Sequence, residues 1–181
     1  MKPAFSDEGI ILRVVDFAEA DKKVGILSHY HGYQEYLARG ARRLNSKKAP
    51  HLDLFNQVKF QAGRGESPQM LLQAETQNYF PQIKNNFEKT RVCLSLAEII
   101  TNILPFEQED KETYLSLANY LHAVNDSSDK NQFGSLTNQF SLYLLKHLGY
   151  PPPPSNLPNL LSDYFETIIN KKIISRQLKM S

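Results

Sequence analysis

The chain has 181 residues, of which 41% are hydrophobic and 22% charged, and its formal net charge is +2. These values are ordinary for a soluble globular protein with one domain or two small ones. The single cysteine, Cys93, excludes an intrachain disulfide and a structural zinc site built on several thiolates. Because neither a signal peptide nor an apolar stretch long enough to cross a membrane is evident, we expect a cytoplasmic protein.

The first 81 residues have the pattern of short strands. Period-two alternation and β-branched residues predict strands at residues 8–15, 23–28, 33–39, 53–62 and 69–80. Turns that contain glycine separate them. Five consecutive strands without a helical period indicate a small antiparallel barrel, and the five-stranded OB barrel fits best. That fold commonly binds oligonucleotides across its middle strands and bordering loops.

After Pro81 the apolar period changes to that of helices. We expect a helix from Asn85 or Asn86 to Leu104, and others at residues 110–124, 133–148 and from Asn156 onward. The first is apolar around most of its circumference and should be the central buried helix. A polar linker at 125–131 and a polyproline spacer at 151–154 join the later helices. The prediction is an α+β chain, with an OB-like barrel domain at 1–81 and an all-helical domain at 82–181.

Positive charge is concentrated in the barrel half. Between residues 22 and 64 the sequence has nine cations and two anions, so the rest of the chain sums to −5. A concentrated positive field indicates a polyanion partner, although a solvated basic loop is the alternative. The candidate DNA-binding cations are Lys22, Lys23, Arg39, Arg42, Arg43, Lys47, Lys48, Lys59 and Arg64.

Aromatic residues accompany these cations. Tyr30, Tyr33 and Tyr36 lie in or beside the third predicted strand. Rings on such strands stack on bases in known single-strand binders, and we place Tyr33 and Tyr36 among the candidate DNA-binding residues. The alternative, that these rings belong to the barrel core, stays open.

No constellation for catalysis is present. The five histidines are scattered or, for His29 and His31, suit a turn, so we expect no metal site and no cofactor. Cys93 lies in the most apolar helix and should be an inert core thiol. Glu98, a carboxylate among apolar residues of that helix, needs a partner, which we expect in the barrel half.

The serial order of several motifs resembles the bacterial recombination mediator and DNA repair family RecO. These motifs are GIILRVVDFAEADKKVGILSHYHG, ARGARRLNSKK, a strand ending NYFP, LSLAEIITNILP and QFSLYLLKHLGYPPP. The resemblance implies an OB fold, binding of single-stranded and duplex DNA, and strand annealing in the bacterial cytoplasm at the nucleoid. It also implies cooperation with RecR and the single-stranded DNA-binding protein in loading the recombinase RecA. By position, Arg39, Arg42, Arg43, Lys47 and Lys48 match the family's basic segment.

One departure from the family pattern is large. Members usually carry a four-cysteine zinc module after the Leu-Gly-Tyr-Pro helix, whereas here Pro154 leads directly into LPNLLSDYFETIINKKIISRQL. The module is expected to be missing through an internal shortening, because the last segment resembles the family's final helix. We therefore expect no zinc.

The helical half is expected to dock partners. It has ten cations and ten anions after Pro81, so it offers no net field to attract DNA. The resemblance suggests the acidic, apolar-ended tail of the single-stranded DNA-binding protein as a ligand, with Lys171, Lys172 and Arg176 as partners for its carboxylates. The whole chain is expected to be a monomeric, non-enzymatic DNA-binding mediator. The alternative is an adaptor whose barrel and basic loop hold an acidic protein.

Overall fold

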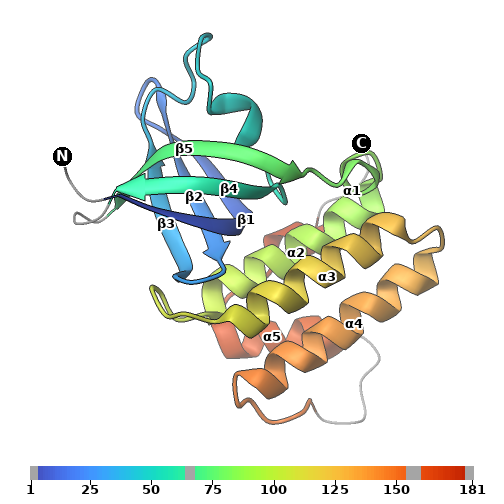
Figure 1. Cartoon of the computed structure of the whole chain (residues 1–181). Helices are drawn as coiled ribbons and strands as arrows, with labels where there is room; N and C mark the ends of the chain where they lie inside the picture. The colour runs from blue at the N-terminus through green and yellow to red at the C-terminus, as the bar shows by residue number, and fades with distance from the viewer. Residues whose placement is uncertain (1–3, 64–67, 154–159, 178–181) are drawn as a thin grey trace. The chain divides into compact units, whose positions relative to one another are not determined.

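The barrel strands combine stretches of alternating buried and exposed side chains with continuous buried runs, which lets a closed sheet form around a single core. The computed structural model describes residues 4–63, 68–153 and 160–177 (Figure 1). Its strands are β1 (Ala4–Phe17), β2 (Asp21–Ser28), β3 (Gly32–Ala38), β4 (Gln57–Gly63) and β5 (Gln69–Asn78). They form a closed barrel in the order β1-β2-β3-β5-β4. The predicted α+β class and OB-like barrel are therefore confirmed.

β1 closes the barrel because it pairs along its two halves with different strands. Its first half pairs with β4, from Ala4 opposite Gly63, and its second half with β2, as far as Phe17 opposite Asp21. The prediction had all strands antiparallel, but β3 and β5 run parallel where they meet. The core is built from apolar side chains and one tyrosine: Phe5, Ile11, Val24, Ile26, Tyr36, Ala38, Ala41, Leu52, Val58, Phe60, Ala62 and Leu71.

The segment after the first long helix groups with the barrel. The chain divides into two compact units, residues 1–79 with 104–118, and residues 80–103 with 119–181. The amide of Glu107 donates to the carbonyl of Tyr33 at 3.1 Å. Gly32 has a φ of +67° and a Cβ there would lie 1.8 Å from the carbonyl oxygen of Gln108, so only glycine fits. The predicted helical domain, 82–181, therefore differs from the observed unit by this segment.

The helical unit contains α1 (Pro81–Lys84), α2 (Phe87–Ile103), α4 (Lys130–His147), α5 (Leu160–Ile169) and the 3₁₀ turn η2 (Ile174–Gln177). It also holds the second half of α3 (Lys111–Asp126). The side chain of Asn86 caps α2 by accepting from the amide of Lys89 at 3.1 Å, and Asp129 caps α4. After α4, Gly149 adopts a φ of +76°, which is the expected helix stop. The predicted cap Asn156 lies outside the described residues.

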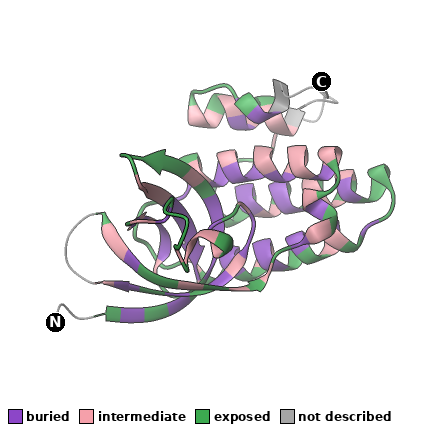
Figure 2. Cartoon of the chain, turned by 90° about the horizontal axis from the view of Figure 1, so that it is seen from above, coloured by how far each residue is buried: buried purple, intermediate pink, exposed green. Residues whose placement is uncertain are grey.

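α2 is the central helix of its unit, as expected from its apolar circumference. It contacts α1, α4, α5 and η2. Its buried apolar residues are Cys93, Leu96, Ala97, Ile99 and Ile100. In Figure 2 the buried residues form stripes along the helices, with exposed residues on the opposite faces. In the part of the chain that the structure describes, no helix is both long and apolar enough to span a bilayer.

A buried lysine joins α2 to the end of α3. Lys89 is 5% exposed, and its Nζ donates to the carbonyls of Asn125 at 2.9 Å and Ser127 at 2.6 Å. These carbonyls lie at the C-terminal end of α3, where the helix dipole favours a cation. The polar linker between these helices is shorter than the predicted 125–131, because α3 continues to Asp126 and α4 begins at Lys130.

Replacing this lysine should destabilise the helical unit. Lys89→Met keeps an aliphatic stem but leaves two carbonyls without their charged donor, and we expect a loss of about 2 to 4 kcal/mol in the free energy of unfolding. Urea denaturation followed by circular dichroism measures this loss. Lys146→Met, at an exposed position of α4, is the matched control and should change stability by less than about 0.5 kcal/mol. Equal stability of the two variants would contradict the structural role of Lys89.

Candidate nucleic-acid interface

The connection between β3 and β4, residues 39–56, carries most of the predicted cations and is anchored at its start. The amide of Gly40 donates to Asp21 Oδ1 at 2.8 Å, and the amide of Arg42 donates to the carbonyl of Ala20 at 2.9 Å. Ala20 belongs to the turn between β1 and β2, and Asp21 is the first residue of β2. Between them Ala41 is buried in the barrel core. The first half of the connection is therefore held against the barrel.

The second half is anchored to β5. Lys48 Nζ donates to the carbonyl of Leu71 at 3.0 Å, and partial burial lowers the pKa of this ammonium group. His51 Nδ1 accepts from the amide of Thr76 at 3.2 Å. Leu52 and Phe55 are buried below it. Both halves of the connection are therefore tied to the barrel, and the connection forms a wall in which Lys48 is one of the anchors.

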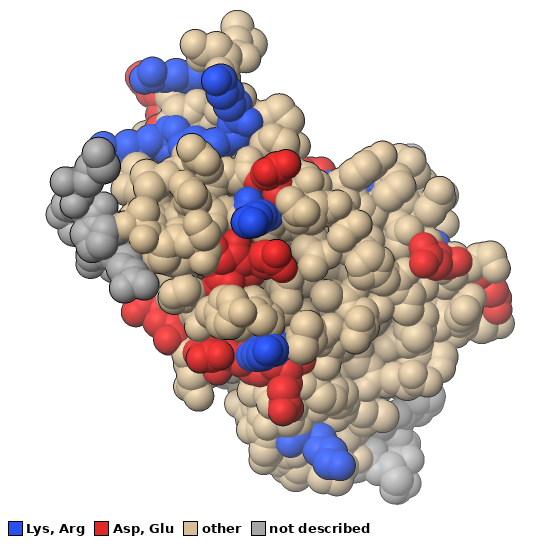
Figure 3. Space-filling model, in the orientation of Figure 1, with Lys and Arg blue, Asp and Glu red and all other residues tan. Residues whose placement is uncertain are grey.

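A cleft of about 980 Å³ lies between this wall and the outer surface of the barrel strands. Its floor has a cross-strand row of neutral polar residues, Ser6 opposite Gln61 and Gln61 opposite Gln73. Figure 3 shows the Lys and Arg side chains gathered at the end of the barrel that the connection covers. The cations that line the cleft are Arg39, Arg43, Lys47, Lys48 and Lys59.

These cations differ in how far neighbours compensate their charge. Lys59 lies in register between two carboxylates, with Glu8 opposite on β1 and Glu75 opposite on β5. Across the described residues, by contrast, Arg39, Arg43 and Lys47 form no ion pair. The uncompensated positive charge therefore lies on the wall and not on the floor.

Of the other predicted cations, Lys22, Lys23 and Arg42 do not line the cleft. Arg42 Nε is 3.4 Å from Asp16 Oδ2, and its Nη1 donates to the carbonyl of Ala18 at 3.2 Å. Lys22 on β2 is opposite Asp16 on β1, and Lys23 Nζ lies 4.7 Å from the centre of the Phe17 ring. Arg64 lies outside the described residues.

The structure corrects the placement of the two tyrosines among the DNA-binding residues. Tyr36 is 0% exposed and belongs to the barrel core, and Tyr33 is 5% exposed beneath Phe106. Burial, with a smaller effect of the Glu35 carboxylate, raises the pKa of Tyr33 to about 12. A ring can stack on a base only through an exposed face, so neither tyrosine can do so here.

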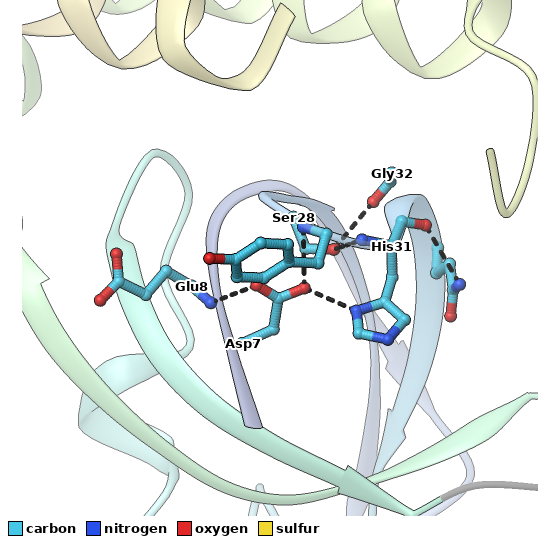
Figure 4. A network of polar contacts seen from close by, with 7 residues as sticks. Asp7, Glu8, Ser28, His31 and Gly32 are labelled. Atoms are coloured by element: carbon cyan, nitrogen blue, oxygen red, sulfur yellow. Dashed lines mark hydrogen bonds and ion pairs between the residues drawn. The ribbon is translucent and has the colours of Figure 1, made fainter. Parts of the chain in front are cut away.

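His31 has the structural role in a turn that the sequence suggests. Its Nδ1 lies 2.7 Å from Oδ2 of Asp7, whose side chain is fully buried and also accepts from the amides of Glu8 and Tyr30 (Figure 4). The hydroxyl of Ser28 donates to the carbonyl of Gly32 in the same turn. These contacts fix the connection of β2 to β3.

Two side chains of the helical unit that could take part in chemistry, Glu98 and Cys93, also have structural roles. Glu98 accepts from the amides of Ile174 at 3.0 Å and Ser175 at 3.2 Å, so its partner is η2 and not the barrel half as predicted. Cys93 is buried, and burial raises the pKa of its thiol to about 12. Within the ranges that the structure covers, no group of His, Cys, Asp and Glu could hold a metal ion.

The predicted partner-binding cations are only partly described. Lys171 and Lys172 are exposed in the turn that follows α5. Arg176 belongs to η2, but its side chain lies outside the described residues.

The sequence prediction missed the neutral floor of the cleft. Alternation within one strand assigns Gln61 to the polar face but does not reveal that Ser6 and Gln73 lie beside it. The signal that could have found them is the strand order, because β1 and β5 both pair with β4. Cross-strand register, and not composition, therefore defines the floor.

Comparisons with known proteins match both parts of the chain to one family. Residues 1–80 match the family described as recombination protein O N terminal, and residues 84–156 match recombination protein O C terminal. A DNA repair protein RecO of Symbiobacterium thermophilum is 32% identical over 148 residues, which cover 82% of this chain and 58% of that protein. A DNA repair protein RecO of Roseiflexus is 30% identical over 148 residues, which cover 82% of this chain and 51% of that protein.

A third relative has a similar extent of match. The DNA repair protein RecO of Rubrobacter xylanophilus is 27% identical over 150 residues, which cover 82% of this chain and 58% of that protein. The chain thus spans little more than half the length of these curated relatives. Both family matches follow each other in chain order and together extend from the barrel through α4. The chain belongs to the RecO family of DNA repair proteins.

Proposed function

We propose that the chain is a non-enzymatic DNA-binding mediator of recombinational repair. The cleft grips the phosphates of single-stranded and duplex DNA, and the protein promotes annealing of complementary strands. With RecR and the single-stranded DNA-binding protein, it assists the loading of RecA. The observation that carries the proposal is the wall of Arg39, Arg43 and Lys47, three cations without ion pairs in the described structure beside a cleft of about 980 Å³. Such a wall suits a repeated anion better than a single charged ligand.

The anchoring of the wall supports the same proposal. The wall is hydrogen-bonded to the β1–β2 turn and the start of β2 at one end and to β5 at the other. Because the backbone that carries these cations is already anchored, binding has to order only their side chains, which lowers the entropic cost of association. Phosphate contacts of this kind position a nucleic acid without selecting its sequence, so we propose little sequence preference.

Charge reversal in the wall tests this function. Arg43→Glu with Lys47→Glu should weaken binding of single-stranded DNA to all sequences alike, by at least about tenfold at low salt. If about four phosphates are neutralised in the native protein, log K falls against log salt with a slope of roughly −3, and the variant's slope should be shallower by roughly 1 to 1.5. Fluorescence anisotropy titrations over a salt series give both quantities.

A matched variant separates local from overall charge. Lys146→Glu with Lys171→Glu makes the same change in net charge within the helical unit and should leave the slope unchanged. Equal weakening by both variants, or no DNA binding by the native protein, would favour the adaptor hypothesis. The melting temperature of each variant should stay close to that of the native protein, because all four side chains are exposed.

We further propose that the helical unit binds the acidic, apolar-ended tail of the single-stranded DNA-binding protein. A groove of about 520 Å³ lies where α4 ends, beside residues 151–153. It is lined mostly by apolar residues, and Lys146 stands at its edge: the lining is Leu142, Leu145, Lys146, Gly149, Tyr150, Pro151, Pro152 and Pro153. An apolar terminus fits this lining, and Lys146 can meet its carboxylate. Lys171, Lys172 and Arg176 stay proposed partners for the remaining acidic residues.

A peptide with the sequence of that tail tests the docking proposal. Leu142→Glu should abolish peptide binding, because it places a carboxylate in the apolar groove, where it repels the terminal carboxylate of the peptide. DNA binding should be unchanged. Lys146→Glu should weaken the peptide at least about fivefold, and Lys171→Glu with Lys172→Glu should weaken it less. Fluorescence polarisation of the labelled peptide measures these effects. Peptide binding that survives Leu142→Glu, or that DNA competes away, would rule out the groove.

A further inference from the structure

Most aromatic rings of the barrel unit are buried. The first 79 residues contain eight aromatic residues, all within the described ranges. Five of them are buried: Phe5, Tyr33, Tyr36, Phe55 and Phe60. Phe60 borders the cleft but is 1% exposed, so it presents no face to a ligand there. The one Phe or Tyr ring among the described residues of the cleft lining therefore belongs to the core.

The exposed rings of this unit lie elsewhere. Phe17, Tyr30 and Tyr79 are 43%, 57% and 59% exposed, Phe106 of the segment 104–118 is 52% exposed, and none of them lines the cleft. The Phe17 ring is covered on one side by Lys23, and the Tyr30 ring packs edge-on against His29 at 4.2 Å. A base lying in the cleft would thus have no Phe or Tyr ring beneath it, and the one imidazole of the described lining, His51, is tied to Thr76 through its Nδ1.

The cleft instead has uncompensated positive charge on its wall, while its floor combines neutral side chains with Lys59 and Glu75, which lie opposite each other in register. Its cationic wall is Arg39, Arg43 and Lys47, and its floor carries the Ser6, Gln61 and Gln73 row beside Leu72 and Ala74. Hydrogen bonds from neutral amides largely replace bonds to water and contribute little net affinity. The dominant attraction in the cleft is therefore between the wall and phosphates.

We infer that the cleft recognises the nucleic-acid backbone alone and holds a strand with its bases free. This inference rests on the proposed DNA binding and specifies its ligand class, a phosphodiester chain whether or not it carries bases. A strand held by its phosphates along the wall keeps its pairing edges available to a second strand. Binding and base pairing then do not compete, which a protein that anneals strands requires.

Comparison of two oligonucleotides of equal length tests the inference. One is oligothymidine, and the other has the same backbone with tetrahydrofuran in place of each base. Stacking on a protein ring is worth about 5- to 150-fold in affinity per base. We expect dissociation constants within about threefold of each other and salt slopes that agree, as measured by competition against a labelled strand.

Permanganate oxidation of thymines gives an independent readout, because the reagent attacks bases that are unstacked and accessible. Thymines of the bound oligothymidine should react as fast as those of the free strand. Phe17→Ala, Tyr30→Ala and Tyr79→Ala should each change affinity by less than about twofold. Abasic binding weaker by tenfold or more, or protected thymines, would overturn the inference while leaving DNA binding intact. Failure of both oligonucleotides to bind would instead overturn the proposed function, and the inference with it.

Discussion

The amide of Gly40 donates to Asp21 at the start of β2, the amide of Arg42 donates to Ala20 in the turn before it, and these two bonds determine where the cations of the wall lie. Ala41 between them is buried in the core, so this part of the connection cannot shift without opening the barrel. At the other end Lys48 Nζ donates a hydrogen bond to the carbonyl of Leu71, so this cation of the basic segment has a structural role. The remaining cations are thus held by a frame that forms when the barrel folds.

Compensation by carboxylates then decides which cations can attract a ligand. Glu35 Oε1 lies 2.6 Å from Arg13 Nη1, and Asp16 forms an ion pair with Arg42. Lys59 lies in register between Glu8 and Glu75. Most positive charge on the strands is therefore balanced within the barrel. What remains is a narrow strip on the wall, where a field is strongest next to a low-dielectric surface. This distribution explains how a chain of net charge +2 can carry a strongly basic site.

Periodicity predicted the five strands, α2 and the approximate bounds of α3 and α4, because each of these elements buries one face of its own sequence. It could not predict contacts between distant segments. Tyr33 is covered by Phe106 and Glu98 binds residues of η2, and neither partner is recognisable from local pattern. The assignment of Tyr33 and Tyr36 to the DNA site failed for the same reason. The basic segment is evident from the sequence, but only the folded connection distinguishes the anchoring Lys48 from the exposed Lys47 beside it.

Lysine footprinting tests the central claim, that the wall of the barrel cleft is the DNA-binding surface, most directly. The protein is acetylated briefly with and without oligothymidine, and the modification of each lysine is measured by mass spectrometry. DNA should protect Lys47 several-fold and leave the exposed lysines of the helical unit, Lys146, Lys171 and Lys172, unchanged. Protection of Lys171 and Lys172 with Lys47 still fully reactive would contradict the account.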